Sequence, residues 1–163
     1  MEGAMAFVFD KSRNKILLVK RRDIPVWVIP GGGIEKGETP ERAAIRETKE
    51  ESGYDIKIIR KIAEYTNRGS NKRNNLFEAV VVGGKARLSN ESKGVAFFDV
   101  DCLPEPHHPL ISDWLGDLNK KSKDVIRREI QGVTIKQALC QVHKHPVAVI
   151  RFILTRFGIR INT

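Results

Sequence analysis

Three glutamates stand close together on one face of a predicted helix. At about 100° per residue, Glu47, Glu50 and Glu51 fall within an arc of about 100°. Like charges at this spacing cost a helix a few tenths of a kcal/mol per pair, so a counter-charge is expected. Carboxylate oxygens suit hard divalent cations, which makes this face a candidate site for Mg²⁺, with Mn²⁺ as a substitute. A solvated acidic face, neutralised by Lys49 and Arg46, is the alternative.

A glycine-rich segment precedes this helix and extends the chemistry that the glutamates can support. Gly31–Gly33 and Gly37 permit positive φ angles and a close approach of backbone to a ligand. Thr39 and Pro40 mark the start of the helix, and a helix N-terminus attracts anions. Backbone donors, metal-binding carboxylates and a carboxylate that activates water are together what the cleavage of a polyphosphate requires.

The spacing of these residues resembles the signature of the Nudix hydrolases. The seven fixed positions of that signature are all present, as Gly32, Glu38, Arg46, Glu47, Glu50, Glu51 and Gly53. The stretch from Gly32 to Tyr54 that contains them is the Nudix box. The similarity extends beyond this box, from residue 4 to about residue 118, and includes Trp27, just before the glycine run. Two positions depart from the family pattern. Thr48 replaces an aliphatic residue, and Gly94 stands where several relatives carry a second acid.

The resemblance implies a role for each residue of the box. The metal ligands would be Glu47, Glu50, Glu51 and the carbonyl oxygen of Gly31. Glu47 is also a candidate general base, and so is Glu91, because relatives differ in the carboxylate that activates water. Arg46 would orient the catalytic glutamate. Glu38 would support the loop before the helix or contact a metal from outside.

Two basic groups are candidates for binding the phosphates of a substrate. One precedes the glycine segment and the other lies in a later loop; they are Lys20, Arg21 and Arg22, and Arg68, Lys72 and Arg73. The backbone of Gly32 and Gly33 would add substrate contacts. The net charge of +9 and the pI of about 9.8 favour the capture of anions in general. Each basic group is equally compatible with a solvated run of charge.

The box identifies the bond that is cut and leaves the rest of the substrate open. The resemblance implies Mg²⁺-dependent hydrolysis of a pyrophosphate bond in a phosphate-rich small molecule. That molecule would be a nucleoside diphosphate linked to another moiety, a nucleoside polyphosphate or a diphosphoinositol polyphosphate. The proline that suggests ADP-ribose in relatives is absent between Tyr54 and Pro104. Pyrophosphohydrolysis at an RNA 5′ end and a non-catalytic nucleotide-binding regulatory module are alternatives.

The apolar runs and turn residues predict an α/β fold with a mixed sheet between helices, and the resemblance implies a Nudix-type α/β/α sandwich. Strands are expected at residues 4–9, 15–20, 26–29, 55–65, 75–82 and 95–100, and a loop at 31–39. Helices are expected at residues 40–52, 110–118, 123–131, 134–143 and 146–157. On the first helix, the stripe expected to pack on the sheet is Ala44, Ile45, Thr48 and Ser52.

The chain is expected to divide into a Nudix domain over residues 1–119 and a basic helical C-terminal extension over residues 120–163. No acidic residue follows Glu129. One apolar stripe repeats at helical spacing near the end of the chain and is formed by Val147, Ile150, Leu154 and Phe157. We expect this stripe to be buried against the core. A homodimer contact and a helix lying on a membrane surface are alternatives.

Residues outside the box suggest no second chemistry. Trp27 is interpreted as a core residue, with stacking on a substrate as the alternative, and the four histidines are interpreted as structural or exposed. Cys102 and Cys140 are far apart in sequence and are expected to be reduced thiols. The N-terminus lacks the pattern of a signal peptide, and no run reaches the roughly 18 apolar residues of a membrane helix. We therefore expect a cytoplasmic protein without a membrane span.

Overall fold

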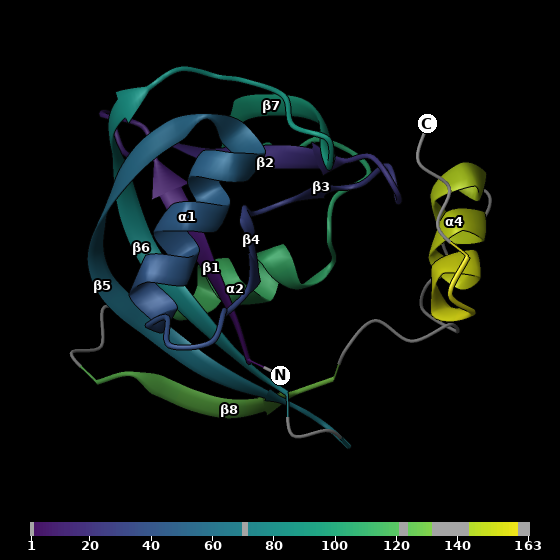
Figure 1. Ribbon diagram of the computed structural model, residues 1–163. Helices are drawn as coiled ribbons and strands as arrows, with labels where there is room; N and C mark the ends of the chain where they lie inside the picture. Colours follow the sequence, from purple (N-terminus) through teal and green to yellow (C-terminus); the bar gives the residue numbers. More distant parts are fainter. Residues whose placement is uncertain (1, 70–71, 121–123, 132–143, 160–163) are drawn as a thin grey trace.

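The computed structural model describes residues 2–69, 72–120, 124–131 and 144–159. The strands are β1 (Glu2–Phe9), β2 (Lys15–Arg21), β3 (Trp27–Val28), β4 (Gly31–Gly33), β5 (Tyr54–Asn67), β6 (Arg73–Gly84), β7 (Ser92–Asp99) and β8 (Ile126–Ile130). The helices are α1 (Pro40–Ser52), α2 (Leu110–Asn119) and α4 (Pro146–Arg156), as Figure 1 shows. The helix expected at residues 134–143 lies outside the described residues.

The strands form one mixed sheet. Its order is β3-β2-β1-β6-β5-β8, with β4 paired to β1 and β7 paired to β2. The pairs β1–β6 and β5–β8 are parallel, whereas β1–β2, β2–β7 and β5–β6 are antiparallel. The first two strands, predicted at residues 4–9 and 15–20, are confirmed, and they pair as an antiparallel hairpin with Phe9 opposite Ile16.

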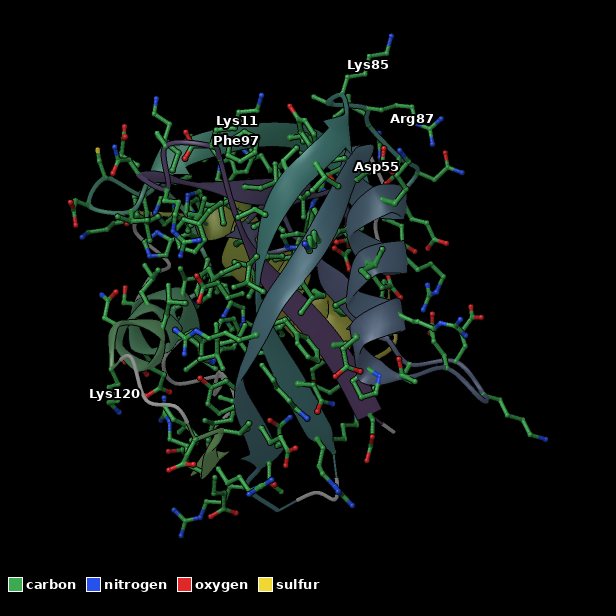
Figure 2. The ribbon with its side chains drawn as sticks, turned by 90° about the vertical axis from the view of Figure 1, so that its left-hand side faces the viewer. Lys11, Asp55, Lys85, Arg87, Phe97 and Lys120 are labelled. Atoms are coloured by element: carbon green, nitrogen blue, oxygen red, sulfur yellow. The ribbon has the colours of Figure 1, made fainter. Side chains whose placement is uncertain are left out.

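Both faces of the sheet are covered by helices. Along β1 the side chains alternate, so that Ala4, Ala6 and Val8 belong to the core beneath α1, while Phe7 and Phe9 belong to the core beneath α2. Figure 2 shows α1 and α2 on opposite sides of the strands. The predicted α/β/α sandwich is therefore confirmed.

The box helix α1 begins and ends as its sequence predicts. The side chain of Thr39 accepts a hydrogen bond from the N–H of Arg42 (3.3 Å), and Gly53 ends the helix with a φ of 81°. The expected packing stripe is wrong at one residue, because Ile45 is 39% exposed. Ala43 is fully buried in its place, and its small side chain lets the helix approach the strands closely.

The glycine run is a strand, and the loop predicted over these residues is wrong at its first three positions. Gly31–Gly33 pair with Gly3–Met5 of β1 as the short antiparallel strand β4. A Cβ atom on Gly31 would lie 2.6 Å from the Cα atom of Met5, so only glycine fits this approach. Because glycine has no side chain, this segment can approach β1 closely enough to pair with it as a strand, where a loop was expected.

The helix predicted at residues 123–131 is wrong, because this segment contains β8. Ile126–Ile130 run parallel to β5, with Ala63 opposite Ile126 and Asn67 opposite Ile130. Burial alternates along the segment and ends with Ile130 at 6% exposure, which is the period of a strand. The edge of β5 offers free backbone groups, and pairing with it outweighs the helical pattern of the segment. The extension thus begins with a strand of the central sheet.

The last helix, α4, is confirmed, but the burial predicted for its apolar stripe is wrong. Val147, Ile150 and Phe157 are 56%, 54% and 75% exposed. The buried residues are instead Ala148 and Val149, at 7% and 4%. The helix therefore buries Ala148 and Val149, whereas three residues of the predicted stripe lie at the surface and the fourth, Leu154, is half-buried. Within the described ranges, no helix is long and apolar enough to cross a membrane.

Candidate active site

The glutamates of α1 meet the glycine strand β4. Glu51 is buried, and its Oε2 accepts a hydrogen bond from the N–H of Gly31 (2.9 Å). Glu47 lies so close to Gly32 that any Cβ atom there would collide with its carboxylate. Glu50 is 60% exposed and lies at the solvent side of the group. Two of the three glutamates therefore line β4, and the third remains accessible to water.

Arg46 connects the loop before α1 to the glutamates on the helix. Its Nε and Nη2 donate to the two carboxylate oxygens of Glu38 (3.0 and 2.9 Å), and Nη2 also donates to the carbonyl of Gly33 (2.9 Å). Its Nη1 donates to Glu47 (3.0 Å) and to Glu50 (3.2 Å). The Glu38 carboxylate raises the pKa of Arg46 above its ordinary value, so the guanidinium stays charged. This geometry supports the orienting role expected for Arg46.

The negative charge of the glutamates on α1 destabilises the protein when no cation is bound. Burial raises the pKa of Glu51 to about 7, against the hydrogen bond from Gly31, and the charges of Glu47 and Glu91 add to the increase. Burial likewise raises the pKa of Glu47, although Arg46 opposes the shift. Two partly desolvated carboxylates therefore lie side by side, and their neighbours do not fully compensate their negative charge. A bound cation would supply the missing positive charge.

The oxygen atoms available as metal ligands at this site fit a hard divalent cation. Carboxylate oxygens on α1 and a backbone carbonyl on β4 are the ligand types that Mg²⁺ and Mn²⁺ prefer. Within the described ranges, no three acidic, histidine or cysteine side chains already converge as metal ligands. Glu50 is hydrogen-bonded to Arg46 instead. The residues that would hold a cation are Glu47, Glu50, Glu51 and the carbonyl oxygen of Gly31.

Glu91 lies on a turn that is attached to the end of α1. The hydroxyl of Ser92 donates to the backbone carbonyl of Glu51 (2.9 Å), and Glu91 itself is exposed. Its charge contributes to the raised pKa values of both Glu47 and Glu51. The tertiary fold thus brings this second candidate base to the same group of carboxylates.

The departure from the family pattern at Gly94 has a steric reason. A Cβ atom at this position would lie 2.9 Å from Cη2 of Trp27 and 3.0 Å from Cβ of Lys20. Trp27 packs edge-on against Phe98, with the ring centroids 4.8 Å apart, and joins the core beneath α2. Trp27 is therefore partly buried against this core, which agrees with its interpretation as a core residue, and a larger residue at position 94 would displace it.

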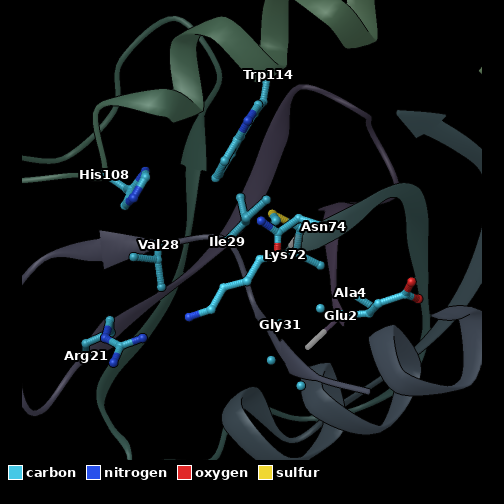
Figure 3. Close-up of a pocket in the computed structure, with 14 residues that line it drawn as sticks. Glu2, Ala4, Arg21, Val28, Ile29, Gly31, Lys72, Asn74, His108 and Trp114 are labelled. Carbon is cyan, nitrogen blue, oxygen red and sulfur yellow. The ribbon is translucent and has the colours of Figure 1, made fainter. Parts of the chain in front are cut away.

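The basic groups are separated by the fold. Arg21 and Lys72 line one pocket, and Figure 3 shows Lys72 extending across it toward Arg21. Arg21 is also paired with Asp23 (2.6 Å). Arg22 turns away and donates to the carbonyl of Ser92 (3.3 Å), and Arg73 lies 3.5 Å from Glu2. The phosphate-binding role therefore has geometric support at Arg21 and Lys72, and it stays a prediction for Arg22 and Arg73.

The pocket has an aromatic wall and shares β4 with the glutamates. Its volume is about 320 Å³, and Gly31, Gly32 and Gly33 line one side of it. His108 and Trp114 line another side and are stacked, with centroids 5.3 Å apart and an interplanar angle of 12°. Burial lowers the pKa of His108 to about 4, so the ring is neutral near pH 7.

The sequence does not predict this aromatic pair. It places His108 among the structural or exposed histidines and Trp114 within the helix expected at residues 110–118. Six positions separate them, and the stack forms because the chain turns at Pro109 into α2. No local periodicity signals such a contact. The pairing of an aromatic residue on a helix with a histidine just before it was the available hint.

Comparison with known proteins agrees with this geometry. The model of the NUDIX domain matches residues 1–118. A Bacillus subtilis (strain 168) protein, provisionally named an 8-oxo-dGTP diphosphatase, is 33% identical over 138 residues, which are 84% of this chain and 88% of that protein. An ADP-ribose pyrophosphatase of Methanocaldococcus jannaschii is 35% identical over 112 residues, 63% of this chain and 66% of that protein. The crystal structure of an ADP-ribose pyrophosphatase from Streptococcus suis 89-1591 superposes with a TM-score of 0.65 at 24% identity, covering 79% of this chain and 98% of that one.

The chain therefore belongs to the Nudix family. It is a Nudix hydrolase, an enzyme of the class that cleaves phosphoric anhydride bonds. Members of this family generally use divalent metal cations, which agrees with the donors found on α1 and β4.

Proposed function

We propose that this enzyme hydrolyses a pyrophosphate bond of a nucleotide, with Mg²⁺ held by Glu47, Glu50, Glu51 and the carbonyl oxygen of Gly31. The observation that carries the proposal is the position of β4. Its glycines form one wall of the aromatic pocket and also contact the glutamates of α1. A base in the pocket would therefore have its phosphates next to the carboxylates.

The pocket favours a nucleotide over a diphosphoinositol polyphosphate. His108 lines its aromatic wall and is backed by the buried Trp114, which is stacked between His108 and Tyr65, and Val28 and Ile29 add apolar atoms. Stacking a base on an aromatic side chain contributes about 1–3 kcal/mol. A ring that carries a phosphate on most carbons would need cations on every side, whereas a neutral His108 supplies none.

The residues divide the chemistry between them. A bound divalent cation neutralises phosphate charge and lowers the pKa of water. Glu47 or Glu91 takes the proton of the water whose oxygen attacks phosphorus, and the P–O–P bridge breaks to release two phosphate-bearing products. Arg46 keeps Glu47 oriented through the 3.0 Å hydrogen bond. Arg21 and Lys72 hold the phosphates from the pocket side.

The names of the relatives support the nucleotide class. One is named for 8-oxo-dGTP and the other for ADP-ribose, and each compound joins a base to a chain of phosphates. The missing proline downstream of the box favours a nucleoside triphosphate over ADP-ribose for this chain. A cytoplasmic location and a homodimer stay predictions.

A substrate panel tests the proposal. Purified full-length protein would be incubated with Mg²⁺ and 8-oxo-dGTP, dGTP, ADP-ribose, 5′-triphosphorylated RNA or a diphosphoinositol polyphosphate, and the release of phosphate and pyrophosphate would be measured. We expect turnover of a free nucleotide that excess chelator abolishes. Turnover of the inositol compound or of RNA alone would contradict the nucleotide assignment. Binding without turnover of any compound would indicate a regulatory module.

A further inference from the structure

The C-terminal helix α4 is attached to the protein at two loops near the proposed active site. Nη1 of Arg151 donates to the backbone carbonyl of Arg22 (3.1 Å), just after the end of β2. Nε2 of His145 lies 3.4 Å from Oε2 of Glu105, in the segment between β7 and α2. These contacts join residues more than a hundred positions apart in one case and forty in the other.

Arg22 in turn holds the turn that carries Glu91. The N–H of Arg22 donates to the carbonyl of Glu91 (2.8 Å), and its Nη2 donates to the carbonyl of Ser92 (3.3 Å). Inside the turn, the hydroxyl of Ser89 accepts hydrogen bonds from the N–H groups of Glu91 and Ser92, both at 3.1 Å. The turn is therefore closed on itself, and Arg22 fixes it to the end of β2.

Ser92 continues the connection to the box helix. It is 2% exposed, and its hydroxyl donates to the backbone carbonyl of Glu51 (2.9 Å). The carboxylate of Glu51 accepts from Gly31 on the glycine strand. An unbroken series of hydrogen bonds thus runs from Arg151 through Arg22 and Ser92 to Glu51.

We infer that Arg151 is a positioning residue for the active site. Its charged guanidinium holds the carbonyl of Arg22, and Arg22 then fixes both the turn of Glu91 and the end of α1 that bears Glu51. A hydrogen bond from a charged donor is roughly twice as strong as a neutral one. The inference rests on the proposed hydrolase function, and it gives Arg22 a role through its backbone and its guanidinium in place of direct phosphate binding.

The opposing interpretation is that Arg151 only anchors α4. His145 provides a matched comparison, because it anchors the same helix to Glu105 and has no described hydrogen bond on the path to Glu51. A purely anchoring role predicts equal effects for the two positions. A positioning role predicts an effect on turnover at Arg151 alone.

The experiment compares three variants of the full chain, R151M, R151K and H145Q. With the best nucleotide of the substrate panel, we expect R151M to lower kcat about tenfold, since small displacements of catalytic groups are costly, and to change KM little. R151K should recover most of the loss by restoring a charged donor. H145Q should keep the kcat of the wild type. Hydrogen exchange of the unliganded protein should accelerate in R151M over residues 20–24 and 89–93, with strands β1 and β6 unchanged.

Several outcomes would overturn the inference. Equal losses of kcat in R151M and H145Q would reduce Arg151 to an anchor, and faster exchange without any change in kcat would show that the path has no catalytic role. Unchanged exchange in R151M would show that Arg151 does not hold the turn. The exchange measurement needs no substrate. If the wild type cleaves no nucleotide, the proposed function fails, and exchange alone still decides whether Arg151 holds the turn of Glu91.

Discussion

Glu51 combines burial, a single backbone hydrogen bond and two carboxylate neighbours, and each of these features has a consequence. Burial raises its pKa to about 7. The exposed Glu50 is hydrogen-bonded to Arg46. A charge kept in such surroundings destabilises the protein without metal. These features fit the proposed cation site, which would stabilise Glu51 in its charged form at some cost to the metal-free fold, as functional sites commonly do.

We expect the substitution Glu51→Gln to lower kcat by about 10²-fold, because a charged ligand of the metal is lost. Glutamine can still accept the hydrogen bond from Gly31. Removing a buried charge should therefore leave the melting temperature of the metal-free protein unchanged or higher. Steady-state kinetics at saturating Mg²⁺ and thermal denaturation measure the two effects. Glu41→Gln, on the exposed first turn of α1, is the control, and a wild-type kcat for Glu51→Gln would exclude the metal role.

The stacked pair makes a separate prediction about binding. Replacing His108 with Ala should raise KM for a nucleotide about tenfold, because stacking energy is lost, while His108→Phe should keep KM within a few-fold. His107→Ala is the neighbouring control. Equal KM values for the Ala and Phe variants would show that the ring does not contact the substrate.

Arg21 and Lys72 are expected to bind phosphate from the pocket side. The double substitution to Ala should raise KM more than it lowers kcat, and it should flatten the dependence of kcat/KM on salt. Lys85→Ala, at an exposed position just after β6, is the control. A salt dependence identical to that of the wild type would make Arg21 and Lys72 ordinary surface charges.

At the scale of elements, local signals were read correctly and non-local pairing was not. The cap at Thr39, the proline after it and Gly53 lie within or next to α1, so the sequence was sufficient to bound that helix and its glutamates. β4 and β8 depend on strands that are distant in the chain, β1 and β5, and no property of Gly31–Gly33 or of Ile126–Ile130 alone reveals that pairing. For the same reason, the sequence did not predict the aromatic wall of the pocket, which also depends on how the folded chain brings residues together.

One buried carboxylate joins α2, β5 and β8. Asp117 is 3% exposed and accepts hydrogen bonds from Tyr65 (2.8 Å), Arg128 (2.7 Å) and Lys120 (2.8 Å). Burial alone would raise the pKa of Asp117, but these three donors lower it below its ordinary value. Its charge therefore stabilises the attachment of α2 and β8 to the sheet.

This network predicts a pH dependence of stability. Since the folded protein holds the pKa of Asp117 below that of the unfolded chain, its contribution is complete above pH of about 4 and is lost as the pH falls through the folded value. Asp117→Asn should lower the free energy of unfolding by about 2 kcal/mol at pH 7. The three donors would then face a neutral amide, which accepts hydrogen bonds more weakly than a carboxylate. The substitution should also flatten the acid limb of a plot of melting temperature against pH. Ser112→Ala, on the exposed side of α2, is the control, and an unchanged acid limb would contradict the role of Asp117.

At the scale of the whole molecule, the question is where the Nudix core ends and the C-terminal extension begins. The NUDIX match ends at residue 118, yet the central sheet continues through β8. The relative from Bacillus subtilis aligns with 84% of the chain, more than residues 1–118 alone provide. The division at residues 119 and 120, predicted from sequence, therefore competes with a division after β8. The exposed large residues of α4 keep a homodimer contact open as a prediction for the part beyond.

Two truncations distinguish these divisions. A chain ending at Lys120 loses β8, and with it the burial of Ile130 and the ion pair between Arg128 and Asp117 (2.7 Å), so we expect it to be insoluble or to melt well below the full-length protein. A chain ending at Gln131 keeps the whole sheet and should fold, with a melting temperature close to that of the intact protein. It lacks Arg151, and its kcat should therefore fall as in R151M while KM stays similar. Light scattering of the full chain and of the chain ending at Gln131 tests the homodimer, because loss of α4 would convert a dimer into a monomer. A chain ending at Lys120 that is as stable and as active as the full-length protein would show that β8 contributes nothing to the core.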